Sequence, residues 1–321
     1  MRKLILLVLL LETGVTLRAQ SGRFVVDDDA YTAQVVLAGE QLLREKKLVP
    51  LDSLRRQVRT KAFVIKALPV SHEKLQPPEV CERLRESTLA VGTLYKCPDC
   101  GGWHFSGSTG FVVSEDGIVS TCCHVIMEDS DPKVAVAFLI AADSTGRVFP
   151  VQSVLAADTE ADTCFLSISG TGLKPLPLRA GVRPGESVYC LSNPGGYFFM
   201  FTQGLVARLN RRTNAETDVH GRSNGVPSRP ILLLNITAEF APGSSGAPVV
   251  DSCGNVVGQV ASIADAGETS AENEDQPTSP SVPIRFCTAA EEILRLSSPS
   301  LVNESHVPAR RSTKKPKQKV H

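Results

Sequence analysis

The sequence lacks net charge and, after its first 20 residues, lacks any long apolar run. It contains 34 Lys and Arg against 34 Asp and Glu among 321 residues. No later segment approaches the roughly 18 apolar residues that a helix needs to cross a bilayer. The composition, 42% hydrophobic and 21% charged, is that of a globular protein and excludes a wholly disordered chain, a collagen and a coiled coil.

The zero net charge is an average over segments that differ strongly. Residues 297–321 hold six basic residues against one acid, and residues 1–19 hold three against one. Residues 20–296 therefore carry 25 basic and 32 acidic residues. An acidic body disfavours an enzyme with a basic groove for nucleic acid, so we expect no nucleic-acid partner. The C-terminal segment is polar and broken by prolines, which predicts a disordered basic tail.

The first 19 residues have the pattern of a signal peptide. Arg2 and Lys3 precede an apolar run from Leu4 to Leu11, and small residues follow up to Ala19. The run is too short to span a bilayer, and positive charges just before it are typical of export signals. We therefore expect an exported protein, periplasmic or secreted, without a transmembrane segment.

Nine cysteines fit an oxidising compartment, and their odd number leaves at least one outside an intramolecular disulfide. Cys97, Cys100 and His104 lie together in the segment CPDCGGWH, at a spacing that zinc accepts. A structural zinc site usually has four protein ligands, and the sequence nearby offers no fourth. A local disulfide or a packed turn is therefore favoured over zinc, and we expect no metal or cofactor.

The chain divides into a helical N-terminal region and an all-β domain. Apolar residues at helical spacing predict an amphipathic helix over residues 31–47. Prolines break up the stretch that follows, so residues 20–77 are interpreted as a helical appendage and linker. Residues 78–296 consist mainly of short apolar runs separated by Gly, Pro and Asp, which predicts strands. Within them, residues 265–281 carry five acids and no base and are expected to form an exposed loop.

Two hairpins can be placed in the β domain. In FVVSEDGIVST, two β-rich runs flank Asp116 and Gly117, a pair that readily adopts the positive φ of a tight turn. The segment APVVDSCGNVVGQVASI repeats the arrangement around Cys253, Gly254 and Asn255. Strand-like segments without long helices between them favour barrels or a sandwich over a parallel α/β core.

Three segments carry a His, an Asp and a Ser in settings that suit nucleophilic catalysis. His124 follows the strand-like run GIVSTCC, Asp162 precedes the run TCFLSI, and Ser245 lies in the glycine-containing turn PGSSG. A serine hydroxyl is a poor nucleophile unless an imidazole takes its proton and a carboxylate orients the imidazole. We therefore predict a catalytic triad of His124, Asp162 and Ser245.

The glycine before Ser245 predicts an oxyanion hole. Such a hole requires two backbone N–H groups that point the same way, and Gly243 can adopt backbone angles that other residues avoid. The donors would be the amides of Gly243 and Ser245. Pro242 and Pro248 bracket this turn.

Other candidate groups fit less well. Asp158 is the nearest competitor for the acid, but it lies four residues farther from the strand. Cys122 and Cys123 adjoin the predicted base, yet neither sits in a glycine turn that could form an oxyanion hole. An α/β-hydrolase needs its acid and histidine after the serine, and only His306 and His321 follow, both in the tail.

These segments resemble the three catalytic motifs of HtrA/DegP-type serine proteases, which are trypsin-like. The similarity is carried by TCCHVI, DTEADTCFLSI and PGSSGAPVVDSCGNVVG and extends over about residues 85–264. It implies a chymotrypsin-like fold of two β-barrels, at about residues 85–178 and 179–286, with the triad in the cleft between them. A short helix at about residues 288–296 would follow. Too little chain remains for the PDZ domain that the family usually carries.

The resemblance also implies protein or peptide substrates, cleaved through an acyl-enzyme without a cofactor. The strand through Val260, Ala261 and Ser262 would pair with an extended substrate. Two alternatives for the primary pocket stay open. Glu239, six residues before the nucleophile, would favour Arg or Lys side chains. Phe240 would instead form an apolar wall for small aliphatic side chains.

Two departures from the family motif concern the serine segment. Ser244 and Ala247 stand where the family usually has Asn and Gly, and both are small. The main prediction is therefore a serine endopeptidase. The alternative is a resting or inactive trypsin-like fold that acts as an exported protein-binding or chaperone-like module, because a complete triad does not by itself create an ordered oxyanion turn.

Overall fold

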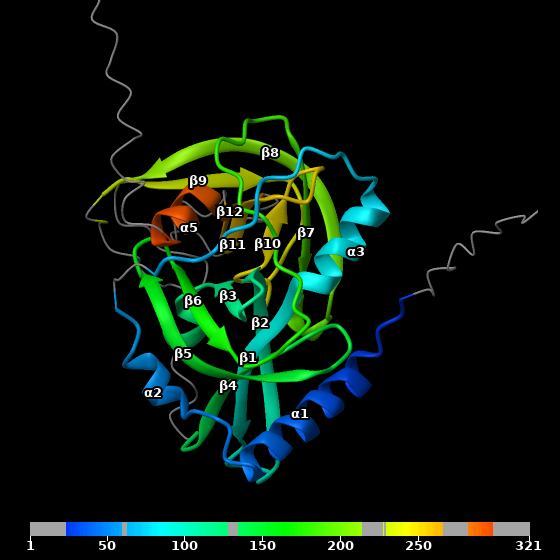
Figure 1. The fold of residues 1–321 in the computed structure, drawn as a ribbon, viewed down its shortest axis with the longest axis vertical. Coiled ribbons are helices and arrows are strands. Elements are labelled where there is room, and N and C mark those ends of the chain that lie inside the picture. Colours follow the sequence, from blue (N-terminus) through cyan, green and yellow to red (C-terminus); the bar gives the residue numbers. More distant parts are fainter. Residues whose placement is uncertain are drawn as a thin grey trace, which may run out of the picture.

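Two closed β-barrels make up most of the computed structural model (Figure 1). The structure describes residues 24–59, 63–127, 134–213, 227, 229–265 and 282–297. Barrel one has the strand order β1-β2-β3-β6-β5-β4. Its strands are β1 (Thr88–Lys96), β2 (Trp103–Ser114), β3 (Ile118–Thr121), β4 (Ala137–Ala142), β5 (Val148–Asp158) and β6 (Thr163–Ile168).

Barrel two repeats this arrangement with the order β10-β11-β12-β9-β8-β7. Its strands are β7 (Ser187–Ser192), β8 (Met200–Arg212), β9 (Ile231–Ile236), β10 (Pro248–Val250), β11 (Val256–Asp265) and β12 (Pro283–Ala289). Neighbouring strands run antiparallel in both barrels. The predicted all-β fold with a chymotrypsin-like double barrel is thus confirmed.

The first predicted hairpin is formed by β2 and β3, and its turn residues explain its position. β2 pairs with β3 across Asp116 and Gly117, and Gly117 has a φ of 78°. A Cβ at Gly117 would lie 2.5 Å from the carbonyl oxygen of Ile168. Glycine is therefore required both by the backbone angle and by the close approach of the neighbouring chain.

An aspartate shapes the turn of the second predicted hairpin, between β10 and β11. Asp251 Oδ1 accepts hydrogen bonds from the amides of Cys253 at 2.8 Å and Asn255 at 3.0 Å. Gly254, between these two residues, has a φ of 76°. Asp at the start of a turn and Gly at the position of positive φ are the residue types that such a turn favours.

The three largest clusters of buried side chains stabilise the fold. One fills barrel one and includes Leu166, and another fills barrel two and includes Leu234. The third contains Phe111 of barrel one together with Tyr189 and Val256 of barrel two. Because this third cluster contains residues of both barrels, it packs the two barrels against each other.

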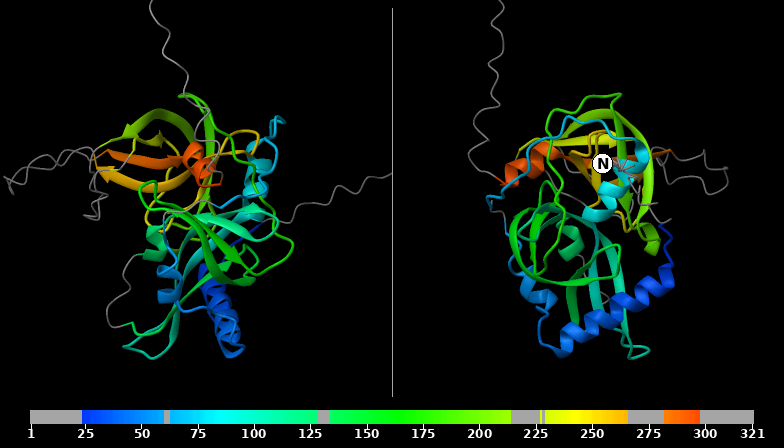
Figure 2. Two further views of the ribbon diagram at one scale, coloured as in Figure 1. Left: turned by 60° about the vertical axis from the view of Figure 1, so that its left-hand side comes forward. Right: turned by 45° about the vertical axis from the view of Figure 1, so that its right-hand side comes forward.

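The N-terminal segment is packed against both barrels. Helix α1 (Asp28–Arg44) lies along the outside of barrel one, where Gly39 leaves room for Leu94 of β1 (Figure 2). Helix α2 (Leu51–Arg55) inserts Leu54 into the core cluster of barrel one. The chain then reaches barrel two, where the amide of Ser71 donates to Asn255 Oδ1 at 2.7 Å, and enters α3 (Pro77–Ser87).

The boundaries of two helices differ from the predicted ones by a few residues. Helix α1 begins at Asp28 because the side chain of Asp27 caps it, accepting a hydrogen bond from the amide of Ala30 at 2.9 Å. Helix α5 (Ala290–Ser297) begins two residues later than predicted, because Thr288 and Ala289 still pair with β11. The remaining short helices are α4 (His124–Met127) and the 3₁₀ turn η1 (Pro194–Gly196).

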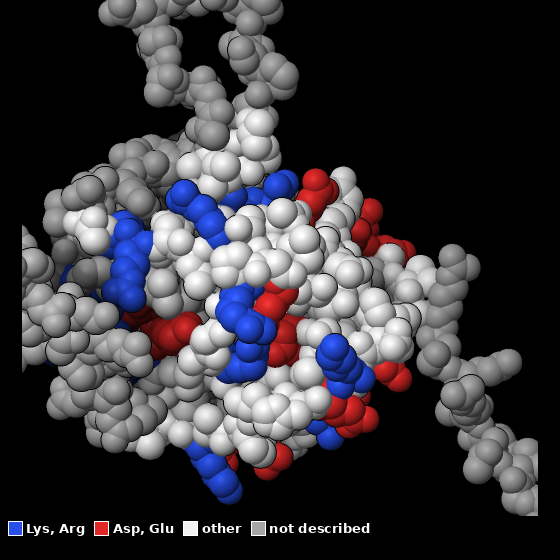
Figure 3. All heavy atoms as spheres, turned by 90° about the horizontal axis from the view of Figure 1, so that it is seen from above, with Lys and Arg blue, Asp and Glu red and all other residues white. Residues whose placement is uncertain are grey.

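Several predicted segments lie outside the described residues. They are the signal peptide at 1–19, the acidic loop at 265–281 apart from Asp265, and the basic tail at 297–321 apart from Ser297. Within the described ranges, no helix has the length and apolar character to cross a membrane. On the face seen in Figure 3, the described basic and acidic side chains are interspersed rather than gathered by sign.

Candidate active site

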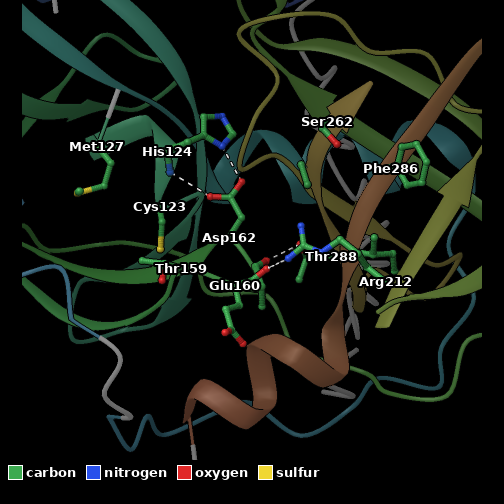
Figure 4. A pocket seen from close by; sticks show the side chains of 13 residues that line it. Cys123, His124, Met127, Thr159, Glu160, Asp162, Arg212, Ser262, Phe286 and Thr288 are labelled. Atoms are coloured by element: carbon green, nitrogen blue, oxygen red, sulfur yellow. Dashed lines mark hydrogen bonds and ion pairs between the residues drawn. The ribbon is translucent and has the colours of Figure 1, made fainter. Parts of the chain in front are cut away.

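His124 is the first residue of α4, which follows strand β3. The chain leaves Thr121 and passes through the buried Cys122 and Cys123 before it reaches this histidine. The backbone N–H of His124 donates to Asp162 Oδ1 at 3.0 Å, and ring Nδ1 lies 2.6 Å from Asp162 Oδ2 (Figure 4). An ionised carboxylate only accepts hydrogen bonds, so Nδ1 carries the hydrogen and Nε2 is the atom that can take a proton from a nucleophile.

Asp162 lies in the tight turn between β5 and β6, which we name the acid turn (residues 158–162). Asp158 shapes it, because its Oδ1 accepts hydrogen bonds from the amides of Glu160 and Ala161, each at 3.0 Å. Asp162 has a φ of 51°, a left-handed conformation that is uncommon outside glycine. Of the two candidate acids, the structure therefore places Asp162 against the imidazole and uses Asp158 to build the turn.

Arg229, just before β9, ties the acid turn to helix α5. Its Nη2 lies 2.6 Å from Asp158 Oδ2, and its Nη1 lies 2.6 Å from Glu292 Oε2. The Glu292 side chain is only 2% exposed. Burial by itself would lower the pKa of Arg229, but the carboxylates of Glu292 and Asp158 outweigh burial and raise the pKa. The ion pairs therefore join a barrel-one turn to the end of barrel two.

Two further contacts from barrel two hold the acid turn. Arg212, at the end of β8, donates a hydrogen bond to the carbonyl of Glu160, and Thr288 Oγ1 donates to the carbonyl of Ala161 at 2.8 Å (Figure 4). The Arg212 residue is 5% exposed. Sequence reasoning missed both arginines, because a basic residue beside a strand is more often exposed to solvent.

Ser245 lies in the turn before β10, which we name the serine turn (residues 241–247). Gly243 and Gly246 have φ values of 96° and 86°. A Cβ at Gly246 would lie 2.2 Å from the carbonyl oxygen of Thr109 in barrel one. Glycine is therefore required here by the backbone angle and by contact between the barrels.

Strand β2 of barrel one holds the serine turn through neutral groups. The carbonyl of Ser245 accepts hydrogen bonds from the Thr109 amide at 3.0 Å and from Ser108 Oγ at 2.9 Å. Thr109 Oγ1 donates to the carbonyl of Gly243 at 2.9 Å and accepts from the Asn193 amide at 3.1 Å. The backbone on both sides of the candidate nucleophile is thus fixed by the opposite barrel.

A hydrogen bond to η1 orients the peptide between Pro242 and Gly243. The Pro242 carbonyl accepts a hydrogen bond from the amide of Gly195 at 2.8 Å and so points towards η1. In a trans peptide the N–H points opposite to the carbonyl, so the amide of Gly243 faces away from η1. Among the described residues, neither this amide nor that of Ser245 has a hydrogen-bond acceptor.

The two departures from the family motif are accommodated by burial. Ser244 is fully buried, and its hydroxyl donates to Ser192 Oγ at 3.0 Å. Ala247 is also fully buried, and its amide donates to the carbonyl of Ser244 at 2.9 Å. Both residues therefore belong to the framework of the serine turn.

The neighbouring cysteines are poor candidates for a nucleophile. Burial raises the pKa of Cys122 well above its ordinary value, and the thiol donates to the carbonyl of Val260 at 3.2 Å. The pKa of Cys123 is also raised, first by its interaction with Cys164 and then by burial. Thiols that stay protonated are unreactive as nucleophiles.

A pocket lies directly beside Ser245. Its walls include four of the predicted substrate-binding residues, namely Phe240, Val260, Ala261 and Ser262. Glu239 lies outside this pocket: its side chain is 81% exposed, and Oε1 is 3.8 Å from Arg285 Nη2. The structure thus places Phe240, and not Glu239, at the pocket beside the candidate nucleophile.

A second pocket is lined by residues of both barrels (Figure 4). Ala261 and Ser262 line both pockets. The second pocket is also lined by His124, Met127 and Phe286. The two pockets thus share Ala261 and Ser262 in their walls, with Ser245 lining one and His124 lining the other.

In the part of the chain that the structure describes, two sets of three side chains bring possible metal ligands within 4.8 Å of one another: Cys122, His124 and Asp162, and Cys97, Cys100 and His104. In the first set the carboxylate binds the imidazole and the buried thiol stays protonated, which suits a triad better than a metal site. The second set lies at the tip of the β1–β2 hairpin. All nine cysteines have free thiols, so of the two alternatives favoured from the sequence at Cys97 and Cys100, a local disulfide or a packed turn, the disulfide is not formed.

Comparison with known proteins agrees with this geometry. Residues 108–258 match the family model of the trypsin-like peptidase domain. The chain is 30% identical to Protease Do-like 1, chloroplastic, of Arabidopsis thaliana over 158 residues, which cover 48% of this chain and 32% of that protein. It is 30% identical to Serine protease HTRA1 of Xenopus laevis over 156 residues, which cover 48% of this chain and 30% of that protein.

A cyanobacterial relative shows similar coverage. The Putative serine protease HhoB of Synechocystis sp. is 29% identical over 152 residues, which cover 47% of this chain and 33% of that protein. The chain thus spans about a third of the length of the curated relatives it matches.

Proposed function

The chain contains a trypsin-like peptidase domain similar to that of HtrA/Do serine proteases, and from this premise we propose that it is a serine endopeptidase. Ser245 attacks the carbonyl of a peptide bond and forms an acyl-enzyme. His124 takes the serine proton through Nε2 and later gives it to the leaving amine. Water then releases the acyl group by the same route in reverse.

The observation that carries this proposal is the paired contact between His124 and Asp162. The two carboxylate oxygens engage the backbone amide and ring Nδ1 of one histidine, at 3.0 Å and 2.6 Å. This fixes the tautomer and the position of the ring, and it stabilises the imidazolium formed during attack.

The negative charge that develops on the substrate oxygen needs donors that are already oriented. The amides of Gly243 and Ser245 serve as these donors in the proposed mechanism. Support comes from the Pro242 carbonyl, which is held away from the site by the Gly195 amide at 2.8 Å. Preoriented donors of this kind are worth about 10²–10³ in kcat.

The substrates are protein or peptide segments in extended form. Ala261 and Ser262 line both pockets and would pair with the substrate backbone, whereas the N–H and the carbonyl of Val260 are already hydrogen-bonded to Ala247 and Gly246 of the serine turn. The buried Phe240 makes the pocket beside Ser245 apolar, which favours small aliphatic side chains next to the cleaved bond. No cofactor takes part in this chemistry.

Labelling with a fluorophosphonate tests the proposal. We expect the wild-type chain to be labelled, and Ser245→Ala, His124→Ala and Asp162→Asn to lose at least about 10³-fold in rate. Ser252→Ala, in the turn after β10, is the matched serine control and should be labelled normally. An unlabelled wild type with intact circular dichroism would overturn the proposal and favour the alternative of a resting or inactive binding module.

Export is a separate proposal that rests on the N-terminal sequence. Arg2, Lys3 and the apolar run that follows support a signal peptide removed after Ala19. We expect the mature chain in the periplasm or in the culture medium after expression with its own N-terminus. N-terminal sequencing tests this, and a chain that starts at Met1 in the cytoplasmic fraction would contradict it.

A further inference from the structure

The tip of the β1–β2 hairpin brings three soft ligand atoms together. Cys97 and Cys100 belong to its turn, and His104 lies near the start of β2. Their ligand atoms all lie within 4.8 Å of one another, and Cys100 Sγ is 3.1 Å from His104 Nε2. We propose that these three side chains bind a zinc ion, with the fourth position open to water.

The backbone of the turn is fixed by two hydrogen bonds and directs an amide at one of the sulfurs. The Cys97 amide donates to the carbonyl of Gly102 at 2.9 Å, and the Gly101 amide donates to the carbonyl of Cys97 at 3.0 Å. The Gly102 amide points at Cys100 Sγ, at 3.3 Å. Amide donors aimed at sulfur stabilise the thiolate, which is the form that binds metal.

The imidazole is also oriented in advance. Tyr95 stacks on His104 with a ring separation of 5.7 Å, and these residues are cross-strand partners in the hairpin. Two thiolates and one imidazole are donors that zinc prefers over magnesium or calcium. The exposure of Cys100 and His104 explains an open fourth position. The free thiols exclude the local disulfide, and the packed turn that the sequence equally favoured brings the three ligand atoms together.

Metal analysis of the full-length chain tests this site. After removal of metal and reloading with zinc under reducing conditions, we expect about one tightly bound zinc per chain. Cys97→Ser, Cys100→Ser and His104→Ala should each reduce it to below about 0.2 per chain. Cys253→Ser, outside the hairpin, is the matched control. Stoichiometry that stays near zero in the reloaded wild type, or that is unchanged in all three variants, would overturn the proposal.

A separate observation concerns the loop after β7 and rests on the proposed function. Helix α1 contacts this loop: the amide of Phe198 donates to Asp28 Oδ1 at 2.9 Å. The ring of Tyr31 lies 4.5 Å from that of Phe198 and 5.5 Å from that of Phe199. All three rings are buried. The N-terminal helix thus anchors a loop that reaches the serine turn.

The same loop determines the orientation of the oxyanion peptide. Asn193 Oδ1 accepts a hydrogen bond from the Phe199 amide at 3.0 Å, and the Gly195 amide holds the Pro242 carbonyl at 2.8 Å. We infer that Asp28 and Tyr31 are positioning residues, which keep this loop in the conformation that turns the Gly243 amide towards substrate.

The loop needs such an anchor because its own backbone is strained. Phe199 has a φ of 59°, a region that a bulky side chain avoids. A conformation of this kind persists only where surrounding contacts favour it. The carboxylate of Asp28 and the ring of Tyr31 supply those contacts from a helix that contributes nothing else to the site.

Kinetics separate positioning from simple stabilisation. We expect Asp28→Ala and Tyr31→Ala to lower kcat about ten-fold with little change in KM, since only the transition state uses the oxyanion amides. Asp28→Asn keeps an oxygen acceptor and should restore most of the rate. Asp29→Ala, on the exposed side of the same helical turn, is the control.

The outcomes distinguish this inference from the proposed function. An active wild type whose Asp28→Ala and Tyr31→Ala variants keep full kcat would overturn the positioning role alone. A lower melting temperature with unchanged kcat below that temperature would do the same. An inactive wild type would instead overturn the proposed function on which the inference rests.

Discussion

The acid turn and the serine turn differ in what holds them. Barrel two holds the acid turn largely with charged side chains, Arg229 and Arg212. Barrel one holds the serine turn with neutral groups, the amide and hydroxyl of Thr109 and the hydroxyl of Ser108. Each barrel thus fixes the turn that the other contributes to the site.

The residues of the two turns explain this difference. The acid turn contains three carboxylates within five residues, namely Asp158, Glu160 and Asp162. Nearby cations offset the repulsion among them. The serine turn has no ionisable side chain, and its glycines let the backbone of β2 approach directly. Ionic contacts should therefore dominate at one turn and close packing at the other.

The largest effect is expected from a methyl group placed between the barrels at the serine turn. Gly246→Ala would put a Cβ 2.2 Å from the Thr109 carbonyl oxygen at a φ of 86°. We expect labelling by a fluorophosphonate to fall at least about 100-fold and unfolding to require about 3 kcal/mol less.

A substitution at a second glycine distinguishes the steric overlap of a new Cβ from the strain of a positive φ. Gly181 has a similar φ of 79°, but a Cβ there would meet nothing within 4 Å. Gly181→Ala should therefore cost only about 1–2 kcal/mol and leave labelling unchanged. Equal effects of the two substitutions would mean that close packing between the barrels does not hold the serine turn.

At the acid turn, the next largest effect should follow loss of one cation. Arg229→Ala removes the cation at Asp158 Oδ2 and leaves the buried Glu292 with only its longer contact to Arg295, at 3.4 Å. Because Arg229 is 27% exposed, we expect a loss of about 2–3 kcal/mol in urea unfolding, below the value for a fully buried pair. The control is Arg44→Ala, whose side chain is 67% exposed and which should change stability by under about 0.5 kcal/mol. Similar small losses for both would argue against an ionic role.

The features that the sequence predicts are those that depend on residues close together in the chain. Asp116 and Gly117 specify a turn by local chemistry, and Gly243 and Ser245 stand within one motif. The turn at Asp116 and Gly117 is therefore found where it was expected, and the roles of Gly243 and Ser245 stay a prediction. The choice between Asp158 and Asp162 also depended on distance to the strand, a local property.

The contacts that sequence could not predict join distant residues. Asp28 and Phe198 are 170 positions apart, and Arg229 and Asp158 are 71 apart. The local sequence around Arg229 does not distinguish it from an exposed arginine, because its partners come close only in the folded barrels. For the same reason the N-terminal helix looked like an appendage, although it packs on both barrel one and the loop after β7.

A smaller effect should come from removing one hydroxyl at the serine turn. Thr109→Val keeps the shape of the side chain but loses the hydrogen bond to the Gly243 carbonyl. We expect a loss of about 1–2 kcal/mol in stability and roughly ten-fold slower labelling. Thr109→Ser retains the hydroxyl and should stay within about three-fold of wild type. If Thr109→Val and Thr109→Ser have the same stability and labelling rate, the Thr109 hydroxyl does not hold the serine turn.

The smallest effect is expected at a charge that lies near the serine turn but faces solvent. Glu239 is 81% exposed and pairs with Arg285 across 3.8 Å, so Glu239→Gln should change stability by under about 0.5 kcal/mol. Cleavage of a peptide library should keep the same preference next to the cut bond, whereas Phe240→Ala, which opens the pocket, should admit larger side chains. If the Glu239→Gln enzyme lost cleavage after Lys or Arg, a charge would determine specificity beside the serine turn. The distinction between an ionic acid turn and a neutral serine turn would then be wrong.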